Sequence, residues 1–165
     1  YFKKIRNTLL TEFVINQKTS SEMEKIAEKI KLLENSCSIH IRRGDYISDK
    51  KANSIHGTCN LDYYTRAIEI IKSKYLNLSF FVFSDDIYWT KENLIIENAL
   101  YINNKSIPHE DIYLMSLCKH NIIANSSFSW WGAWLNKNDY KTVIAPKKWF
   151  VDKENEVACE NWIKL

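Results

Sequence analysis

Hydrophobic positions along the chain switch repeatedly between strand-like and helix-like spacing. Short apolar or alternating runs predict strands, and they fall at 38–42, 78–83, 100–102, 121–124 and 142–145. Apolar residues at three- and four-residue spacing predict helices, at 1–16, 22–33, 64–75, 90–98, 110–119 and 130–136. Strands that alternate with helices predict parallel strands joined by right-handed crossovers. The expected fold class is therefore α/β, a Rossmann-like parallel sheet flanked by helices.

Local signals set the expected ends of these elements. Ser21 and Glu24 have the spacing of a capping box before the second helix, and Thr90 is a candidate N-cap. The residues after Arg42 predict a turn at 43–46 and then a polar loop to Asn60. Gly132, in the tryptophan-rich helix, is expected to allow a close approach of that helix to the sheet.

Length and composition fit one ordinary globular domain. The chain has 165 residues, 45% hydrophobic and 26% charged, with no linker or repeat, so a single domain over 1–165 is expected. A net charge of +3 is too small to predict nucleic-acid binding. No apolar run approaches the ~20 residues that cross a bilayer. Because Tyr1 leads directly into a helix-like sequence, we expect a fragment of a longer protein.

The four cysteines predict small buried side chains rather than a metal site. They are scattered at Cys37, Cys59, Cys118 and Cys159, without the close spacing of zinc ligands. A domain of this size does not need disulfides, so a reducing, cytoplasmic compartment is expected. A glycan on the Asn125 sequon would block the segment with the strongest functional signal, which also favours the cytoplasm.

Polar segments follow three of the predicted strands. Arg42–Asp45, Ser84–Asp86 and Asn125–Ser127 each come directly after a strand. In open parallel sheets, ligands bind beyond the carboxyl ends of the strands. These segments are far apart in sequence, but the fold predicts that they converge on one site.

The adjacent Arg42 and Arg43 suit an anionic group such as phosphate. A guanidinium is costly to bury without a negative partner, and its planar fork donates two parallel hydrogen bonds to phosphate. An internal ion pair with Asp45 explains the same residues equally well. Asp85 and Asp86 suit recognition of guanine or ribose, although one of them is also expected to cap a helix. A magnesium site is the weaker interpretation of this pair.

Asn125–Ser129 leads from a strand into a helix. Free N–H groups and a partial positive charge at a helix start hold phosphate well, and serine hydroxyls add donors. Ordinary capping by serine is the alternative interpretation. The tryptophans that follow, at 130–134, are expected mostly to pack in the core.

Four segments together resemble the motifs of glycosyltransferase family 11, the α-1,2-fucosyltransferases. They are HIRRGDY at 40–46, HGTCNLDYY at 56–64, FSDD at 83–86 and NSSFSWWGAWLN at 125–136. The resemblance implies one lobe of a two-lobed GT-B enzyme, namely the C-terminal lobe that binds the donor. The N-terminal lobe, which helps to shape the acceptor cleft, would be missing here.

The resemblance also implies a reaction. L-Fucose would pass from GDP-β-L-fucose to a glycan hydroxyl, with terminal galactose as the expected acceptor, by inversion and without a metal or other cofactor. A cytoplasmic protein, at most peripheral to the inner membrane face, is expected. Two rival interpretations remain: a non-catalytic nucleotide-sugar-binding module, and a structural domain whose arginines pair only with its own acids.

The resemblance assigns roles residue by residue. Arg42 would contact the β-phosphate and the leaving oxygen, His40 the nucleoside and Asp85 the guanine, while Arg43 and Asp45 brace the loop. The candidate substrate-binding residues are His40, Arg42, Arg43, Asp85, Asn125, Ser126, Ser127 and Phe128. Asp45 and Asp49 are candidates for a general base, which stays unassigned.

Overall fold

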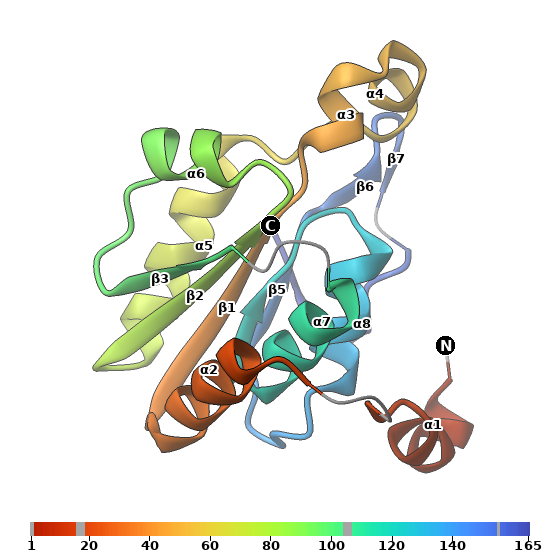
Figure 1. The fold of residues 1–165 in the computed structure, drawn as a ribbon. Helices are drawn as coiled ribbons and strands as arrows, with labels where there is room; N and C mark the ends of the chain where they lie inside the picture. Colours follow the sequence, from red (N-terminus) through yellow and green to blue (C-terminus); the bar gives the residue numbers. More distant parts are fainter. Residues whose placement is uncertain (1, 16–18, 104–106, 155) are drawn as a thin grey trace.

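In a computed structural model, described here for residues 2–15, 19–103, 107–154 and 156–165, the chain folds around a parallel sheet. Its six strands are β1 (Asn35–Ile41), β2 (Leu78–Ser84), β3 (Ala99–Ile102), β4 (His120–Ile122), β5 (Val143–Ala145) and β8 (Ile163–Lys164). They lie in the order β3-β2-β1-β4-β5-β8, and every pair is parallel. This is the strand order of a Rossmann fold, so the predicted fold class is confirmed (Figure 1).

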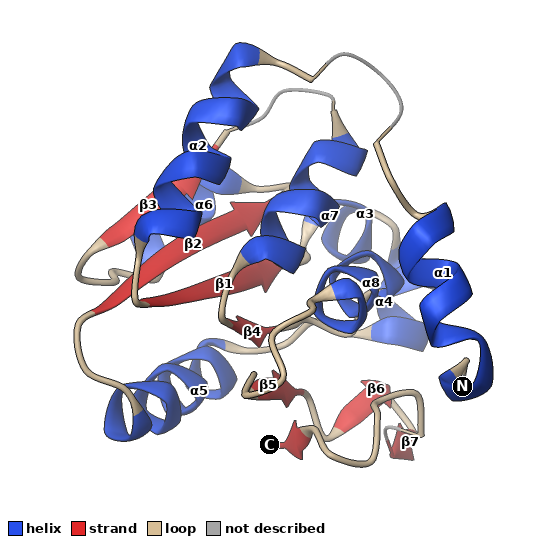
Figure 2. Cartoon of the chain, turned by 90° about the horizontal axis from the view of Figure 1, so that it is seen from below, coloured by secondary structure: helices blue, strands red, loops and turns tan. Residues whose placement is uncertain are grey.

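Helices cover both faces of the sheet, with α5 on one side and α2, α7 and α8 on the other (Figure 2). The helices are η1 (Lys3–Ile5), α1 (Arg6–Glu12), α2 (Ser21–Leu32), α3 (Gly44–Ser48), α4 (Lys50–His56), α5 (Leu61–Lys74), α6 (Ile87–Asn93), α7 (Pro108–Leu117) and α8 (Ser127–Leu135). A small antiparallel hairpin, β6 (Lys148–Phe150) and β7 (Lys153–Glu154), lies outside the sheet.

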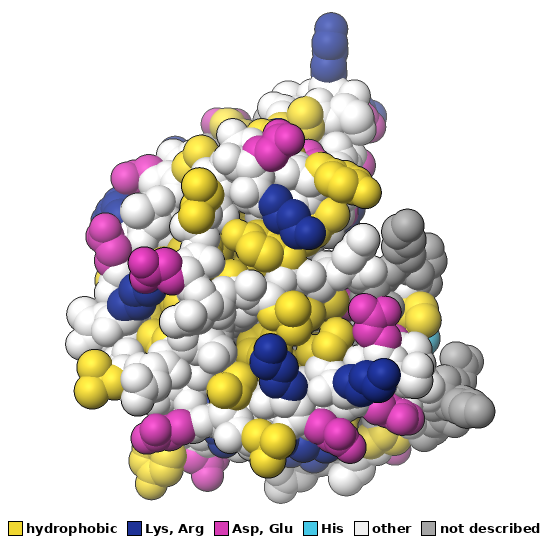
Figure 3. Space-filling model, turned by 60° about the vertical axis from the view of Figure 1, so that its left-hand side comes forward, with side chains coloured by type: hydrophobic (Ala, Val, Ile, Leu, Met, Phe, Trp, Pro, Cys, Tyr) yellow, Lys and Arg dark blue, Asp and Glu magenta, His cyan; other side chains and the backbone are white. Residues whose placement is uncertain are grey.

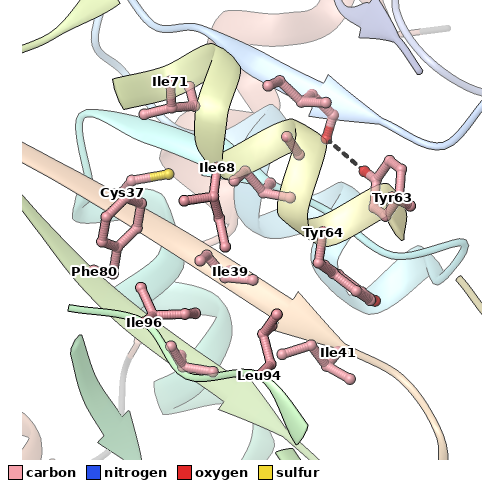
Figure 4. Packing of buried hydrophobic residues seen from close by; sticks show 14 of the residues in the cluster. Cys37, Ile39, Ile41, Tyr63, Tyr64, Ile68, Ile71, Phe80, Leu94 and Ile96 are labelled. Carbon is pink, nitrogen blue, oxygen red and sulfur yellow. Dashed lines mark hydrogen bonds between the residues drawn. The ribbon is translucent and has the colours of Figure 1, made fainter. Parts of the chain in front are cut away.

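The apolar run in β2 explains how both faces are held. Phe80 and Val82 belong to the core cluster under α5, whereas Phe81 and Phe83 belong to the cluster under α2 and α7. Side chains alternate across a strand, so a strand covered on both faces must be apolar at nearly every position. Figure 4 shows the first cluster, with Ile68 and Ile71 of α5 packed over the sheet.

Two predicted helix caps are wrong, by one residue at α2 and by four residues at α6. Ser20, not Ser21, caps α2 and accepts a hydrogen bond from the Met23 amide. Glu24 instead accepts from the Thr19 hydroxyl at 2.7 Å. At α6 the cap is Asp86, whereas Thr90 is buried inside the helix and donates to the Asp86 carbonyl. At α2 the neighbouring serine takes the capping position, and at α6 an aspartate one turn earlier takes it.

The predicted turn and polar loop after Arg43 are also wrong, because two short helices, α3 and α4, fill most of 44–56. They carry no buried residue, so no apolar periodicity marked them in the sequence. The expectation for Gly132 needs correction as well. A Cβ there would lie 2.8 Å from the Met115 Cβ, so the glycine permits close packing of α8 against α7 rather than against the sheet.

Other sequence expectations can be compared directly with the structure. Among the described residues no cysteine forms a disulfide, and Cys37 and Cys118 are buried. Trp130 and Trp134 are buried in a core cluster with Trp149, as predicted for the tryptophan-rich helix. In the described part of the chain, no helix is both long and apolar enough to cross a membrane. The first predicted helix becomes η1 and α1, and positions 1 and 16 of that prediction lie outside the described residues.

Candidate functional site

The three polar segments meet at the carboxyl end of the sheet, as predicted. β1 lies between β2 and β4, with Ile41 opposite Ser84 and Ile39 opposite Ile122. Arg42, Asp85 and Asn125 therefore leave neighbouring strands at the same edge. Figure 1 shows α3 leaving the end of β1 and α6 the end of β2. We refer to the Arg42–Asp45 segment as the arginine loop.

Arg42 is held by two carboxylates of its own chain. Its guanidinium lies 2.7 Å from Asp45 Oδ1 and 2.9 Å from Asp85 Oδ2, and the side chain is 32% exposed. The Tyr46 ring also lies near the guanidinium, with 5.4 Å between Cζ and the ring centre. The internal ion pair considered as an alternative from the sequence is thus present. Arg42 is nevertheless accessible, so a phosphate could compete with these carboxylates.

Asp85 braces the arginine loop. One carboxylate oxygen accepts a hydrogen bond from the Arg43 amide at 2.9 Å, and the other pairs with Arg42. A Cβ on Gly44 would lie 2.6 Å from Asp85 Oδ2, which explains why the loop has glycine there. Because both oxygens are engaged within the chain, guanine recognition by Asp85 remains a prediction and would require a change of partners.

Arg43 points toward α6. Its Nε lies 3.3 Å from Asp86 Oδ2, and its guanidinium carbon lies 3.3 Å from the centre of the Trp89 ring. Asp86 also accepts a hydrogen bond from the Trp89 amide, capping α6. These contacts fix Arg43 against its neighbours and fit a bracing residue. Trp89, a half-buried residue of α6, was not singled out from the sequence.

The start of α8 has donors to spare. Ser126 is the N-cap residue, but its side chain makes no capping hydrogen bond. Its own amide donates to the Ala124 carbonyl at 2.8 Å, and the helical ladder begins with the Trp130 amide. Within the described residues, no acceptor is recorded for the amides of Ser127, Phe128 or Ser129. Such a helix start favours an anion, and α8 follows the strand next to β1.

His40 lies beneath this helix start as a neutral side chain. It is only 4% exposed, and its ring centre lies 5.3 Å from that of Phe128. Burial, and then the nearby Arg42, lower the pKa of His40 from 6.5 to about 3. Its Nδ1 is buried and has no hydrogen-bond partner among the described residues. Because so little of its surface is exposed, His40 packs against Phe128 and offers little surface to a ligand.

The Asn125 side chain faces the protein interior instead of the site opening. It is 3% exposed, and its Nδ2 donates to the carbonyls of His56 at 2.8 Å, Gly57 at 3.3 Å and Trp149 at 3.3 Å. Its Oδ1 accepts from Cys59 Sγ at 3.6 Å. Asn125 therefore ties α4, the loop after it and β6 to the start of α8. A direct contact between this amide and a substrate does not fit the geometry.

The two candidate bases are both exposed acids on the same side of the site. Asp45 makes its one recorded side-chain contact, among the described residues, with Arg42. Asp49 caps α4 and accepts from the Lys51 amide at 2.8 Å and the Ala52 amide at 3.3 Å. The geometry does not favour either as a base, so the assignment remains open.

A cluster of aromatic rings beside the arginine loop was not identified from the sequence. The Tyr46 and His56 rings are stacked, with centres 4.7 Å apart, and His56 also contacts Phe150 at 5.3 Å. The Tyr46 hydroxyl approaches the Asn125 carbonyl at 3.5 Å, and burial raises the pKa of Tyr46. These residues come from α3, α4 and β6, so only the folded chain brings them together.

A large groove lies elsewhere on the described surface. It has a volume of about 1130 Å³ and runs between the α1–α2 connection, α2 and α7. Its walls include Phe13, Met23 and Ile112, and none of the candidate site residues contributes to it.

Over the described ranges, no group of three or more His, Cys, Asp or Glu side chains is arranged to hold a metal ion. On the face in Figure 3, acidic and basic side chains are interspersed.

Comparison with known proteins establishes the family. The sequence model of glycosyl transferase family 11 matches residues 1–165, so the chain belongs to this family. It is 43% identical over 141 residues to the alpha-1,2-colitosyltransferase of Escherichia coli, covering 79% of this chain and 48% of that protein. It is 42% identical over 135 residues to the O-antigen biosynthesis glycosyltransferase WbnK of Escherichia coli, covering 79% and 45%.

Two more distant matches are named as fucosyltransferases. The galactoside alpha-(1,2)-fucosyltransferase 1 of Leontopithecus chrysomelas is 22% identical over 149 residues, covering 84% of this chain and 41% of that protein. The solved structure of the fucosyltransferase NodZ from Bradyrhizobium matches with a TM-score of 0.44 and 13% identity, over 78% of this chain and 57% of that one. The chain spans about half the length of the curated relatives it matches.

Proposed function

We propose that this chain is the donor-binding lobe of an α-1,2-glycosyltransferase, and that it holds a guanosine diphosphate sugar between Arg42 and the start of α8. Family membership supports glycosyl transfer, and the names of the relatives support an α-1,2 linkage and a deoxy sugar such as fucose. GDP-β-L-fucose is the donor we favour, with transfer to a glycan hydroxyl and inversion at the anomeric carbon. Terminal galactose is the acceptor we favour.

One observation carries the proposal. The amides of Ser127, Phe128 and Ser129 form an uncapped helix start that follows β4, and Arg42 follows the adjacent strand β1. A departing diphosphate gains negative charge. Preorganised amides and a guanidinium stabilise that charge best because they need little rearrangement during the reaction. No metal is required in this proposal, since these groups supply the positive potential.

The remaining residues position this pair. Asp85 and Gly44 fix the arginine loop, Arg43 anchors it to α6, and Asn125 anchors the start of α8. We expect the acceptor cleft and the general base to involve a second lobe as well. In the alternative, a non-catalytic nucleotide-sugar-binding module, the same pocket would bind the donor without turnover.

The first test is binding of GDP to the isolated chain. We expect GDP and GDP-fucose to raise the melting temperature by mass action, and UDP to do so much less. Arg42→Ala should weaken binding by about 2 kcal/mol, roughly thirtyfold, as expected for a lost charged hydrogen bond. Arg66→Ala is the matched control, because Arg66 pairs with Asp62 on the surface of α5. The substitution removes the same charge as Arg42→Ala.

The results would discriminate between the interpretations. Equal protection of the Arg42→Ala and Arg66→Ala variants by GDP would contradict the proposed site. Loss of stability in Arg42→Ala, with no effect of GDP on the native chain, would favour a structural domain whose arginine pairs only with its own acids. Addition of the complementary lobe with an acceptor would then separate the transferase from the non-catalytic module.

A further inference from the structure

We propose that Asp45 is an exchangeable counter-ion for Arg42, which the diphosphate displaces when it binds, whereas Asp85 stays in place. This inference rests on the proposed function and describes how that site is regulated. It concerns the two carboxylates that hold the same guanidinium at similar distances, 2.7 Å for Asp45 and 2.9 Å for Asp85.

The two carboxylates are anchored very differently. Asp85 is bound a second time, by the Arg43 amide at 2.9 Å, and Gly44 packs directly against its carboxylate. Its side chain is 24% exposed. Asp45 has a 55% exposed side chain, and Arg42 is its one recorded side-chain partner among the described residues. Loss of its contact with Arg42 therefore leaves Asp45 free to rotate into solvent.

The energies favour exchange at Asp45. An exposed ion pair contributes little because solvent screens it and ordering two side chains costs entropy. A phosphate that accepts two parallel hydrogen bonds from a guanidinium, together with helix amides, gains more. Displacement of Asp85 would instead break its hydrogen bond with the Arg43 amide and disrupt the arginine loop. The diphosphate is thus expected to take the Asp45 side of Arg42.

The exchange has two consequences for the site. Asp45 keeps Arg42 in a fixed position, so the arginine is already oriented when the diphosphate arrives. Asp45 also competes with the diphosphate and reduces its affinity. Removing the charge of Asp45 should therefore strengthen GDP binding, although the substitution deletes a contact from the native structure.

The test compares the GDP affinity of Asp45→Asn with that of Asp49→Asn, measured by calorimetry. Asp49 is the matched control because it is an exposed acid four residues away that caps α4 and makes no recorded contact with Arg42. Asparagine is also a good N-cap, so Asp49→Asn removes the same charge and keeps the helix. We expect Asp45→Asn to bind GDP two- to fivefold more tightly than the native chain. The change in GDP affinity for Asp49→Asn should be less than half as large.

Each outcome is informative. Equal affinities of the two variants, or weaker binding by Asp45→Asn, would overturn the exchange and leave the proposed function intact. If the native chain does not bind GDP at all, the proposed function fails, and the exchange fails with it. Circular dichroism would check that both variants fold, and Asp45→Ser, which also lacks the charge, should reproduce the gain of Asp45→Asn.

Discussion

The arginine loop and the start of α8 lie side by side at the carboxyl end of the sheet, yet only one of them is satisfied by the protein. Arg42 has two carboxylate partners, whereas the first amides of α8 have no side-chain cap. A partly buried guanidinium without a negative partner is costly. At the start of α8, Ser126 and Ser129 are buried but Ser127 is exposed, so water can solvate its neutral backbone amide at little cost. A charged anchor must therefore bring its own counter-ions, but a helix start need not.

The comparison suggests a division of labour. The first amides of α8 supply hydrogen-bond donors of fixed direction. Arg42 supplies a positive charge that Asp45 and Asp85 partly neutralise. The residues behind both features, Asp85 and Asn125, are the ones whose loss should be most damaging to the fold.

Asn125→Ala should destabilise the chain by about 3 kcal/mol. Asn125 donates to three carbonyls and is buried, so the substitution removes these hydrogen bonds and leaves buried acceptors unpaired. Urea unfolding followed by circular dichroism measures the change. Asn35→Ala is the control, because the partly exposed Asn35 donates one hydrogen bond to the Leu76 carbonyl, and its loss should cost less than about 1 kcal/mol. Similar losses in both variants would contradict the anchoring role of Asn125.

His40 should make the fold sensitive to acid. Unfolded histidine binds a proton below its ordinary pKa of 6.5, but in the folded chain the pKa is lowered to about 3, mainly by burial. Between these values the unfolded state binds more protons, so the free energy of unfolding falls as pH decreases. The slope from this one residue reaches about 1.4 kcal/mol per pH unit.

The measurement is the free energy of unfolding of the native chain and of His40→Gln at several values from pH 4 to 7. The variant should show a flatter pH dependence over this window. Parallel curves for the two proteins would mean that His40 is not kept neutral under the start of α8.

Ser126→Asp should make the start of α8 behave like the arginine loop. A carboxylate at the N-cap accepts from the free amides and complements the helix dipole, so stability should rise by about 0.5–1 kcal/mol. The same carboxylate would occupy the proposed phosphate position, and GDP affinity should fall about tenfold. Ser126→Asn caps the helix without the charge and should lower the affinity less. Undiminished GDP binding by Ser126→Asp would place the diphosphate away from α8.

The sequence predicts the sheet well because burial on both faces leaves a clear record. The predicted strands at 38–42, 78–83 and 121–124 all correspond to strands or their immediate ends, and the polar residues at their carboxyl ends do converge. Short exposed helices leave no such record. α3 and α4 bury no residue, so their polar sequence looked like a loop.

The individual roles of the site residues depend on contacts that sequence spacing cannot give. Asp85 and Asp86 are adjacent, but one holds the arginine loop and the other caps α6 and pairs with Arg43. Asn125 stands beside the serines in sequence, but its side chain points inward. Tyr46 and His56 stack because α3 and α4 fold back on each other. Each of these distinctions depends on which strands and helices are neighbours.

A crystal structure of the chain with GDP tests the central claim most directly. We expect the β-phosphate to lie within hydrogen-bond distance of both the Arg42 guanidinium and the amides of Ser127 or Phe128, with Asp85 still bound to the Arg43 amide. A diphosphate bound in the groove between α2 and α7, or bound without contact to either Arg42 or α8, would contradict the account.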